Sequence, residues 1–182
     1  QDLAIVDDGY ITAWGDWASL KPKEFPQESG GMTAVADNIR RNKMIPGLWM
    51  APFACDKHSK IAKEHPDWII RNSMGRFANS SNCGKFFYGL DATNPAVRDF
   101  AFNSIRRAVK EWGYKCLKLD FLYAACLDGN GKYDLSMSRA ETMYLALQTV
   151  RAAAGPDTFI IGCGCPLGPA IGYVDGMRIS AD

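Results

Sequence analysis

The sequence lacks the features that mark nucleic-acid-binding, membrane-spanning and disordered proteins. Its 21 Lys and Arg residues nearly balance its 20 Asp and Glu residues, so its net charge of +1 gives no electrostatic basis for binding nucleic acid or an anionic membrane. No apolar run approaches the ~20 residues that cross a bilayer. With 47% apolar and 23% charged residues, the composition is that of a soluble globular protein.

Histidine and cysteine are also scarce. The chain has two histidines, His58 and His65, and its six cysteines are too sparse for a small disulfide scaffold. The closest pair, Cys163 and Cys165, has no second Cys/His pair at zinc-finger spacing. We therefore expect reduced, mostly buried thiols and no structural zinc site.

The 182 residues are enough to bury a sizeable core, and we expect one domain over residues 1–182 with no second domain. The chain begins Gln1-Asp2-Leu3, without a Met or a signal-like segment, so it is processed, trimmed or incompletely represented. The compartment cannot be read from such a chain, although the missing signal segment and the cysteine spacing slightly favour the cytoplasm.

Short apolar runs alternate with stretches of helical periodicity. The pattern predicts strands at residues 3–8, 44–53, 114–123, 158–164 and 176–182. It predicts helices at residues 31–43, 57–64, 94–112 and 138–154, with a hairpin or irregular excursion at 67–90. Strands separated by helices indicate right-handed βαβ units and a parallel sheet.

Polar or reactive side chains stand at the carboxyl end of every predicted strand. They are Asp7 and Asp8, then Trp49, then Lys118 and Asp120, then Cys163, and finally Arg178 and Asp182. In parallel α/β folds the sites lie at these strand ends, and in a (β/α)8 barrel they converge on one mouth. The alternative is that these residues are ordinary loop charges in contact with solvent. The recurrence of such residues at one strand end after another, in apolar surroundings, favours a site.

The two most informative carboxylates are Asp120 and Asp182. Lys118 and Asp120 are two residues apart on a strand and point to the same side, which fits either a buried ion pair or a nucleophile kept ionised by the lysine. Asp182 fits either a chance position or a general acid/base. Held ~5–5.5 Å apart across a glycosidic bond, two carboxylates perform double displacement with retention of configuration.

Four stretches carry a family resemblance: "IVDDGY…GDW", "GLWMAP…KEHPDW", "YKCLKLDF" and "GCGCP…DGMRISAD". They resemble, in that order and over essentially the whole chain, the landmark segments of the melibiase-type α-galactosidases, glycoside hydrolase family 36 and its clan relative family 27. The resemblance implies a retaining α-galactosidase on a (β/α)8 TIM barrel, with no metal or organic cofactor. It also implies that Asp120 is the nucleophile and Asp182 the acid/base.

The resemblance implies a galactose subsite as well. Asp7 and Asp8 match a pair that holds sugar hydroxyls, Lys118 and Arg178 match cations near the nucleophile and the acid/base, and Trp49 and Cys163 match residues that line the subsite. Trp49 would offer an aromatic wall to the sugar's C–H surface. Ordinary core packing for Trp49 and a buried thiol for Cys163 remain the alternatives.

Three departures from the family pattern leave the sugar open. Tyr10 stands where the family usually has Trp, the Met-Ala-Pro segment after Trp49 lacks an acidic residue often found nearby, and Cys163-Gly-Cys-Pro replaces Cys-x-Ser-Gly-Gly. Hydrolysis of another sugar and transfer of galactose to an acceptor other than water therefore stand beside α-galactoside hydrolysis. An α-galactoside oligosaccharide or glycoside is the expected partner, with no nucleic acid and no membrane.

The length of the chain also departs from the family. When the predicted strands are matched to those of the family's barrel, residues 3–8 correspond to barrel strand two and residues 176–182 to strand six. A full barrel takes ~250 residues. A five-stranded part of a barrel has two open edges and an uncovered interior, which promotes association. We therefore expect a fragment or an ordered part of a longer chain, which self-associates through its open edges if autonomous. A partial barrel that folds or binds sugar without turnover is the non-enzymatic alternative.

Overall fold

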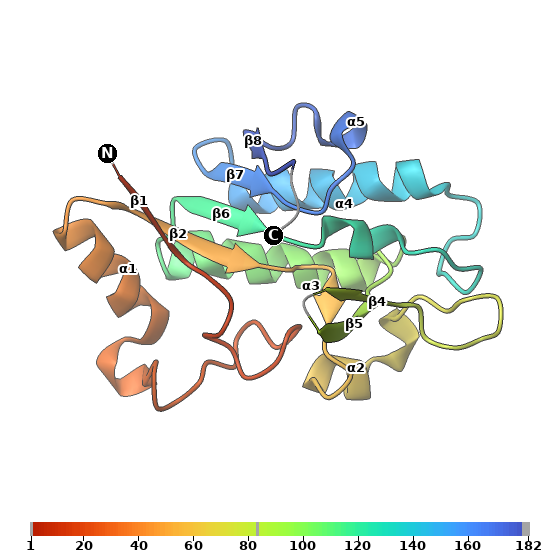
Figure 1. Ribbon diagram of the computed structural model, residues 1–182, viewed down its shortest axis with the longest axis horizontal. Coiled ribbons are helices and arrows are strands. Elements are labelled where there is room, and N and C mark those ends of the chain that lie inside the picture. Colours follow the sequence, from red (N-terminus) through yellow and green to blue (C-terminus); the bar gives the residue numbers. More distant parts are fainter. Residues whose placement is uncertain (1, 83, 180–182) are drawn as a thin grey trace.

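The computed structural model describes residues 2–82 and 84–179, and its centre is a five-stranded parallel sheet (Figure 1). The strands are β1 (Leu3–Val6), β2 (Ile45–Met50), β6 (Cys116–Leu119), β7 (Phe159–Gly162) and β8 (Gly176–Met177), in that spatial order. All four neighbouring pairs are parallel, so the predicted α/β class is confirmed, and a strand lies within each of the five predicted segments. The last strand covers only Gly176–Met177 of the predicted 176–182, of which residues 180–182 lie outside the described part of the chain. Within the described residues the sheet does not close into a barrel.

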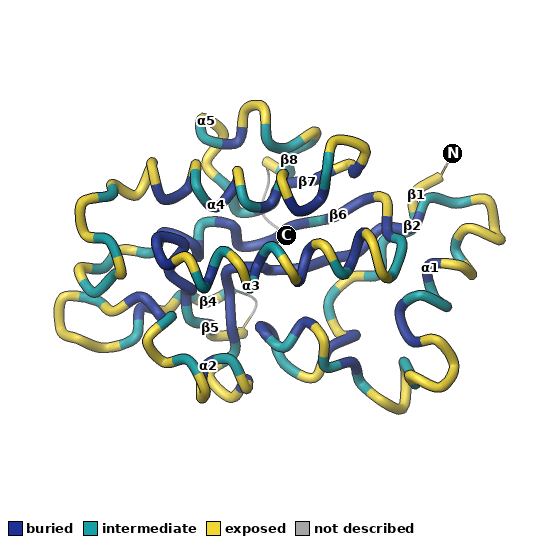
Figure 2. Tube along the Cα trace, turned by 180° about the vertical axis from the view of Figure 1, so that it is seen from behind, coloured by how far each residue is buried: buried dark blue, intermediate teal, exposed yellow. Residues whose placement is uncertain are grey.

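Helices connect the strands and cover one face of the sheet. They are α1 (Gly31–Arg41), α3 (Pro95–Arg106) with a π-helical extension η3 (Arg107–Glu111), α4 (Arg139–Ala154) and the short α5 (Leu167–Ala170). In the view from behind, α3 lies in front of the largely buried strands β2 and β6, and α4 runs beside it (Figure 2). None of the helices in the described ranges is long and apolar enough to cross a membrane.

The helix ends follow local sequence signals. Ser138 and Glu141 form the reciprocal pair of hydrogen bonds of a capping box at the start of α4. Asn94 accepts a hydrogen bond from the amide of Ala96, and Pro95 occupies the first position of α3. Gly113 stops the extension of that helix in the left-handed region, at φ 81°.

The segment between β2 and α3 forms a second, antiparallel sheet. It contains β3 (Ala54–Cys55), α2 (Lys60–Glu64), η2 (Pro66–Trp68), β4 (Asn79–Asn82) and β5 (Lys85–Gly89), with strand order β3-β5-β4. The hairpin predicted in this excursion is therefore confirmed, and Figure 1 places it beyond the carboxyl end of β2. There it approaches η4 (Leu122–Cys126), the short helix that follows β6.

Apolar side chains from the sheet and the helices share one core. Leu48, Leu117 and Ile160 of the central strands are fully buried, as are Ile105 of α3 and Leu147 of α4. The five described cysteines are free thiols, four of them buried and Cys165 partly so. The expectation of reduced, mostly buried thiols is confirmed for these five.

Candidate active site

The carboxyl ends of the parallel strands carry a cavity of about 280 Å³. Five predicted site residues line it, namely Asp7, Asp8, Trp49, Lys118 and Asp120. Four residues that the sequence did not single out complete the lining, namely Trp14, Asn82, Lys85 and Phe121. The volume lies just below the ~300–1,000 Å³ of small-molecule sites, which suits a ligand as small as a single sugar ring.

Asp120 is the most buried carboxylate of this cavity, with 4% of its surface exposed. Its Oδ2 accepts a hydrogen bond from the indole N–H of Trp49 at 3.1 Å, and its Oδ1 accepts one from the amide of Phe121 at 2.9 Å. Arg178 completes the setting, with Nη2 lying 3.8 Å from Oδ1. A buried charge requires such partners, and together they fix the carboxylate in one orientation.

The backbone turns sharply directly after Asp120. Phe121 has φ 49° and ψ 37°, a left-handed conformation that costs a non-glycine residue roughly 1–2 kcal/mol. Its ring packs between those of Trp14, with centroids 5.3 Å apart, and Phe87, with centroids 4.9 Å apart. These aromatic contacts stabilise the turn that aims Asp120 into the cavity.

Lys118 pairs with Asp7 and not with Asp120. Its Nζ lies 2.7 Å from Asp7 Oδ2, and the described residues contain no ion pair within 4 Å between Lys118 and Asp120. The sheet register explains this pairing, because Trp49 is level with Lys118, and Asp7 follows the residue level with Leu48. Asp7 and Lys118 therefore lie in one row, and the Lys118–Asp120 ion pair, one of the two alternatives for these residues, is wrong.

The Asp7–Lys118 ion pair sets the ionisation of Asp7. Partial burial by itself would raise the pKa of this carboxyl group. The hydrogen bond and charge of Lys118, the amide of Asp8 and the charge of Arg178 outweigh burial and hold the pKa below its ordinary value. Asp7 is therefore an anion at neutral pH, a state suited to accepting hydrogen bonds from hydroxyls.

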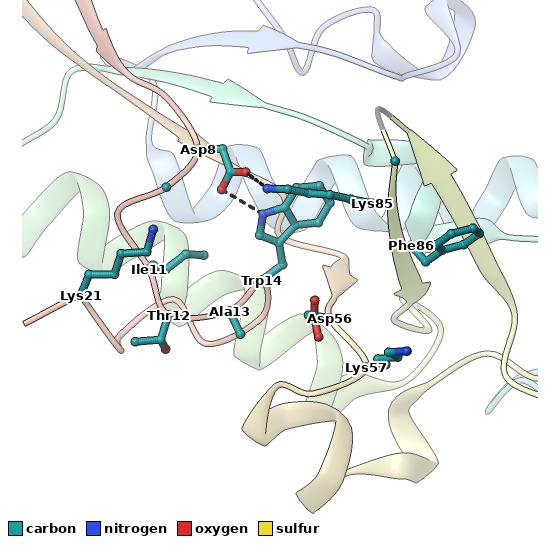
Figure 3. Close-up of a pocket in the computed structure, with 12 residues that line it drawn as sticks. Asp8, Ile11, Thr12, Ala13, Trp14, Lys21, Asp56, Lys57, Lys85 and Phe86 are labelled. Carbon is teal, nitrogen blue, oxygen red and sulfur yellow. Dashed lines mark hydrogen bonds and ion pairs between the residues drawn. The ribbon is translucent and has the colours of Figure 1, made fainter.

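Asp8 is held by two residues that the sequence did not mark. Trp14 donates its indole N–H to Oδ1 at 2.9 Å, and Lys85 of β5 places its Nζ 2.5 Å from Oδ2 (Figure 3). Lys85 also lies 4.9 Å from the centroid of the Trp14 ring. The contact with Trp14 lies within the loop after β1, whereas no local signal could have found the contact with Lys85, because it joins that loop to a hairpin more than 70 residues later.

Trp49 and Cys163 differ in their position relative to the cavity. Trp49 is 2% exposed and packs against Trp14, so it belongs to the core and also donates to Asp120. Cys163 is fully buried and does not line the cavity, although it neighbours Asp120. Burial, followed by the charge of Asp120, raises the pKa of its thiol, which keeps the group protonated.

Asp182 lies outside the described residues, so its role and its distance from Asp120 remain predictions. Arg178, four residues before it, already stands beside Asp120 at the end of β8. In residues 2–82 and 84–179, no three His, Cys, Asp or Glu side chains are grouped so as to hold a metal ion.

The family model described as Melibiase matches residues 2–151 of this chain. The chain belongs to the melibiase family. Among curated proteins, this melibiase-family chain is 26% identical over 176 residues to an A type blood α-D-galactosamine galactosaminidase from Flavonifractor plautii, covering 88% of this chain and 16% of that protein. It is 28% identical over 105 residues to an α-galactosidase from Escherichia coli, covering 54% of this chain and 14% of that protein.

Solved structures agree with the sequence comparison. The α-galactosidase of Thermus thermophilus, in complex with p-nitrophenyl α-D-galactopyranoside, is 36% identical with a TM-score of 0.85, covering 100% of this chain and 35% of that one. The α-galactosidase AgaA of Geobacillus stearothermophilus has a TM-score of 0.74 at 17% identity, covering 97% of this chain and 26% of that one, and shows the fold alone. These relatives are TIM-barrel glycosidases, so the melibiase resemblance and the (β/α)8 class are confirmed, with five parallel strands of such a barrel present. The chain spans about a third of the first of these structures and about a sixth of the galactosaminidase.

Proposed function

We propose that the protein is a retaining glycoside hydrolase that cleaves terminal α-galactosides. One observation carries the proposal: a buried carboxylate, Asp120, is oriented by Trp49 and paired with Arg178 at the wall of a cavity sized for one sugar ring. Membership of the melibiase family supports this assignment, since its relatives from Escherichia coli and Thermus thermophilus are named α-galactosidases.

The proposed reaction has two displacement steps. In the first, a carboxylate oxygen of Asp120 bonds to the anomeric carbon while the bond from that carbon to the leaving oxygen breaks, and Asp182 gives that oxygen a proton. In the second, water attacks the anomeric carbon of the galactosyl ester, Asp182 takes the water's proton, and Asp120 leaves as a carboxylate. Two inversions return the original configuration.

The polar side chains of the cavity supply the galactose contacts in this proposal. Asp7 and Asp8 accept hydrogen bonds from sugar hydroxyls, and Lys118 donates one. Arg178 lies near Asp120, where charge changes during the reaction. The aromatic faces of Trp14 and Trp49 border the sugar's C–H surface.

Turnover of p-nitrophenyl α-galactoside by the purified protein, beside Asp120→Ala, tests the proposal. We expect the variant to lose about 10³-fold or more of kcat, because a nucleophile has no substitute within the enzyme. Added azide is expected to restore turnover of Asp120→Ala and to yield the β-galactosyl azide, since a small anion then attacks in place of Asp120. Equal rates for the two proteins would refute Asp120 as the nucleophile.

A second sugar is also a candidate, because one relative is named a galactosaminidase. The p-nitrophenyl glycosides of α-galactosamine and α-galactose, assayed side by side, separate these substrates. A binding protein without turnover is the third outcome, and binding of galactose with no p-nitrophenol release from either glycoside would identify it. Addition of an oligosaccharide acceptor separates hydrolysis from transfer through the chain length of the products.

A further inference from the structure

A second cavity, of about 390 Å³, adjoins the cavity that contains Asp120. We call the cavity with Asp120 the inner cavity and the second one, lined also by Thr12, Lys57 and Phe86, the outer cavity. Three residues line both of them, namely Asp8, Trp14 and Lys85. The two spaces are therefore neighbours with a shared wall, and we call these three residues the partition.

The partition is tied together through the carboxylate of Asp8. One oxygen accepts from Trp14 at 2.9 Å and the other lies 2.5 Å from Lys85, as the dashed lines in Figure 3 show. The ammonium of Lys85 is 4.9 Å from the centre of the Trp14 ring, so all three members contact one another. The partition is thus held by polar contacts between side chains and not by the backbone.

Lys85 is the one removable member of the partition. The Trp14 residue is 9% exposed, and its ring packs against Trp49, Phe87 and Phe121, so replacing it would disturb the core. The side chain of Lys85, in contrast, is 58% exposed and extends from a surface hairpin. Shortening Lys85 opens a passage between the cavities without a loss of core packing.

The position of the partition determines which part of a bound sugar meets it. If Asp120 attacks the anomeric carbon, as the proposed function requires, that carbon lies at the β6 end of the inner cavity. In a pyranose ring, carbon 4 and its neighbouring CH₂OH group lie on the side opposite the anomeric carbon. Asp8 follows β1, which is separated from β6 by β2, so the hydroxyls on carbons 4 and 6 point toward the partition.

We propose that Lys85 is a specificity-determining residue that closes the inner cavity at this end. The lysine restricts the enzyme to galactose in which the hydroxyl nearest the partition, on carbon 4 or carbon 6, is free. A substituent on the hydroxyl that faces the partition would have to occupy the position of the Lys85 side chain. The outer cavity is the space that such a substituent enters when Lys85 is shortened. This inference rests on the proposed function and deepens it.

Kinetics with substituted glycosides test the role of Lys85. The purified protein and Lys85→Ala are assayed with p-nitrophenyl α-galactoside and with its 4-O-methyl and 6-O-methyl ethers. For at least one ether, we expect the preference in kcat/KM for the unsubstituted glycoside to fall by about tenfold or more in Lys85→Ala, because a misplaced methyl group costs 10–200-fold in a fitted pocket. Unchanged preferences for both ethers would overturn the proposal.

Two matched variants distinguish the effect of the size of the Lys85 side chain from the effect of its charge. Lys85→Met keeps the unbranched stem but removes the ammonium group that holds it to Asp8, so it is expected to lose less of the wild-type preference than Lys85→Ala loses. Lys57→Ala removes another exposed lysine from the outer cavity, outside the partition, and is expected to change nothing. A loss of preference in Lys85→Met as large as that in Lys85→Ala would show that charge and not bulk discriminates, and would overturn the proposal.

Binding to the wild-type protein supplies a readout that needs neither turnover nor a variant. Calorimetric titration with galactose and with its 4-O-methyl and 6-O-methyl ethers is expected to show binding at least about tenfold weaker for one ether. Equal affinities would overturn the role of Lys85, even if the enzyme is active. Failure to cleave the unsubstituted glycoside, with the difference in affinity intact, would overturn the proposed function alone; no binding of galactose would overturn both.

Discussion

Trp49 donates its indole N–H to the carboxylate of Asp120 at 3.1 Å, although 71 residues separate the two in the chain. Trp49 is therefore a positioning residue for the proposed nucleophile as well as part of the core. Trp49→Phe removes a hydrogen bond to a charged group, worth ~1.5–3 kcal/mol. We expect kcat to fall by about 10–100-fold, because each ~1.4 kcal/mol corresponds to a factor of ten.

Trp17→Phe is the matched control for Trp49→Phe. Trp17 is equally buried and contacts Trp49, but its indole N–H has no hydrogen-bond partner in the described part of the chain. Both substitutions remove the same volume, but Trp49→Phe also removes the hydrogen bond to Asp120, whereas Trp17→Phe removes a donor that has no partner. Trp49→Phe should therefore lower the unfolding free energy more than Trp17→Phe, and only the change at Trp49 should reduce kcat. Equal losses of kcat would attribute the effect to packing and not to the hydrogen bond.

The ion pair between Asp7 and Lys118 predicts a measurable pKa. Since Lys118 lowers the pKa of Asp7 against the opposing effect of burial, Lys118→Met should raise that pKa. The depressed pKa contributes stability above the unfolded-state value of about 3.9, and this stability is lost as pH falls through the lower folded-state value. Carboxyl-carbon NMR titration of Asp7 in both proteins measures the shift.

Lys57→Met is the control for this titration, because Lys57 is exposed and has no ion pair with Asp7. It should leave the pKa of Asp7 unchanged. A pKa that is the same in wild type and Lys118→Met would contradict the assignment of the ion pair.

Gly89 allows the antiparallel hairpin to contact the segment after β6. A Cβ atom at this position would lie 2.4 Å from the carbonyl oxygen of Ala124, a backbone atom that cannot rotate away. Gly89→Ala should lower the unfolding free energy by about 1–3 kcal/mol, the usual effect of overpacking. Urea denaturation followed by circular dichroism measures the loss.

Gly168→Ala provides a control with the same added methyl group. A Cβ atom there would meet no atom within 4 Å, and we expect a change within about 0.5 kcal/mol. Similar destabilisation at both positions would count against the close contact at Gly89.

The two edges of the parallel sheet predict self-association of the 182-residue chain, which stays a proposal. Leu3 at one edge is 42% exposed, and Ile179, after the other edge strand, is 83% exposed. Analytical ultracentrifugation should detect oligomers whose mass increases with concentration, and Leu3→Lys with Ile179→Lys should reduce them by placing charge at both edges. Tyr144→Lys, on an exposed position of α4, should have no effect. A monomer at all concentrations would refute the idea.

Much of the fold was predictable because its signals are local. The strand runs, the capping box at Ser138 and the stop at Gly113 each depend on residues within one turn or one strand. The placement of Asp7, Asp8, Trp49, Lys118 and Asp120 around one cavity followed from a general property of parallel sheets, whose carboxyl ends share one edge. Neither inference needed knowledge of distant contacts.

The pairings inside the site were not predictable in the same way. Lys118 was expected beside Asp120, two residues away, yet its partner is Asp7, 111 residues away. The left-handed turn at Phe121 had no marker in the sequence, because the aromatic rings that pack against Phe121 come from distant segments. Contacts of this kind depend on sheet register and on loop closure, which no local pattern encodes.

The sequence by itself determined the order of strands and helices, the family, and the edge of the sheet at which the polar side chains gather. The tertiary structure alone decided which of those side chains touch: Trp49 with Asp120, Lys118 with Asp7, and Lys85 with Asp8. The physical reason is that periodicity and capping act over a few residues, whereas each of these contacts closes a loop of more than 70 residues. Only the packed sheet and hairpin bring such distant segments within hydrogen-bonding distance.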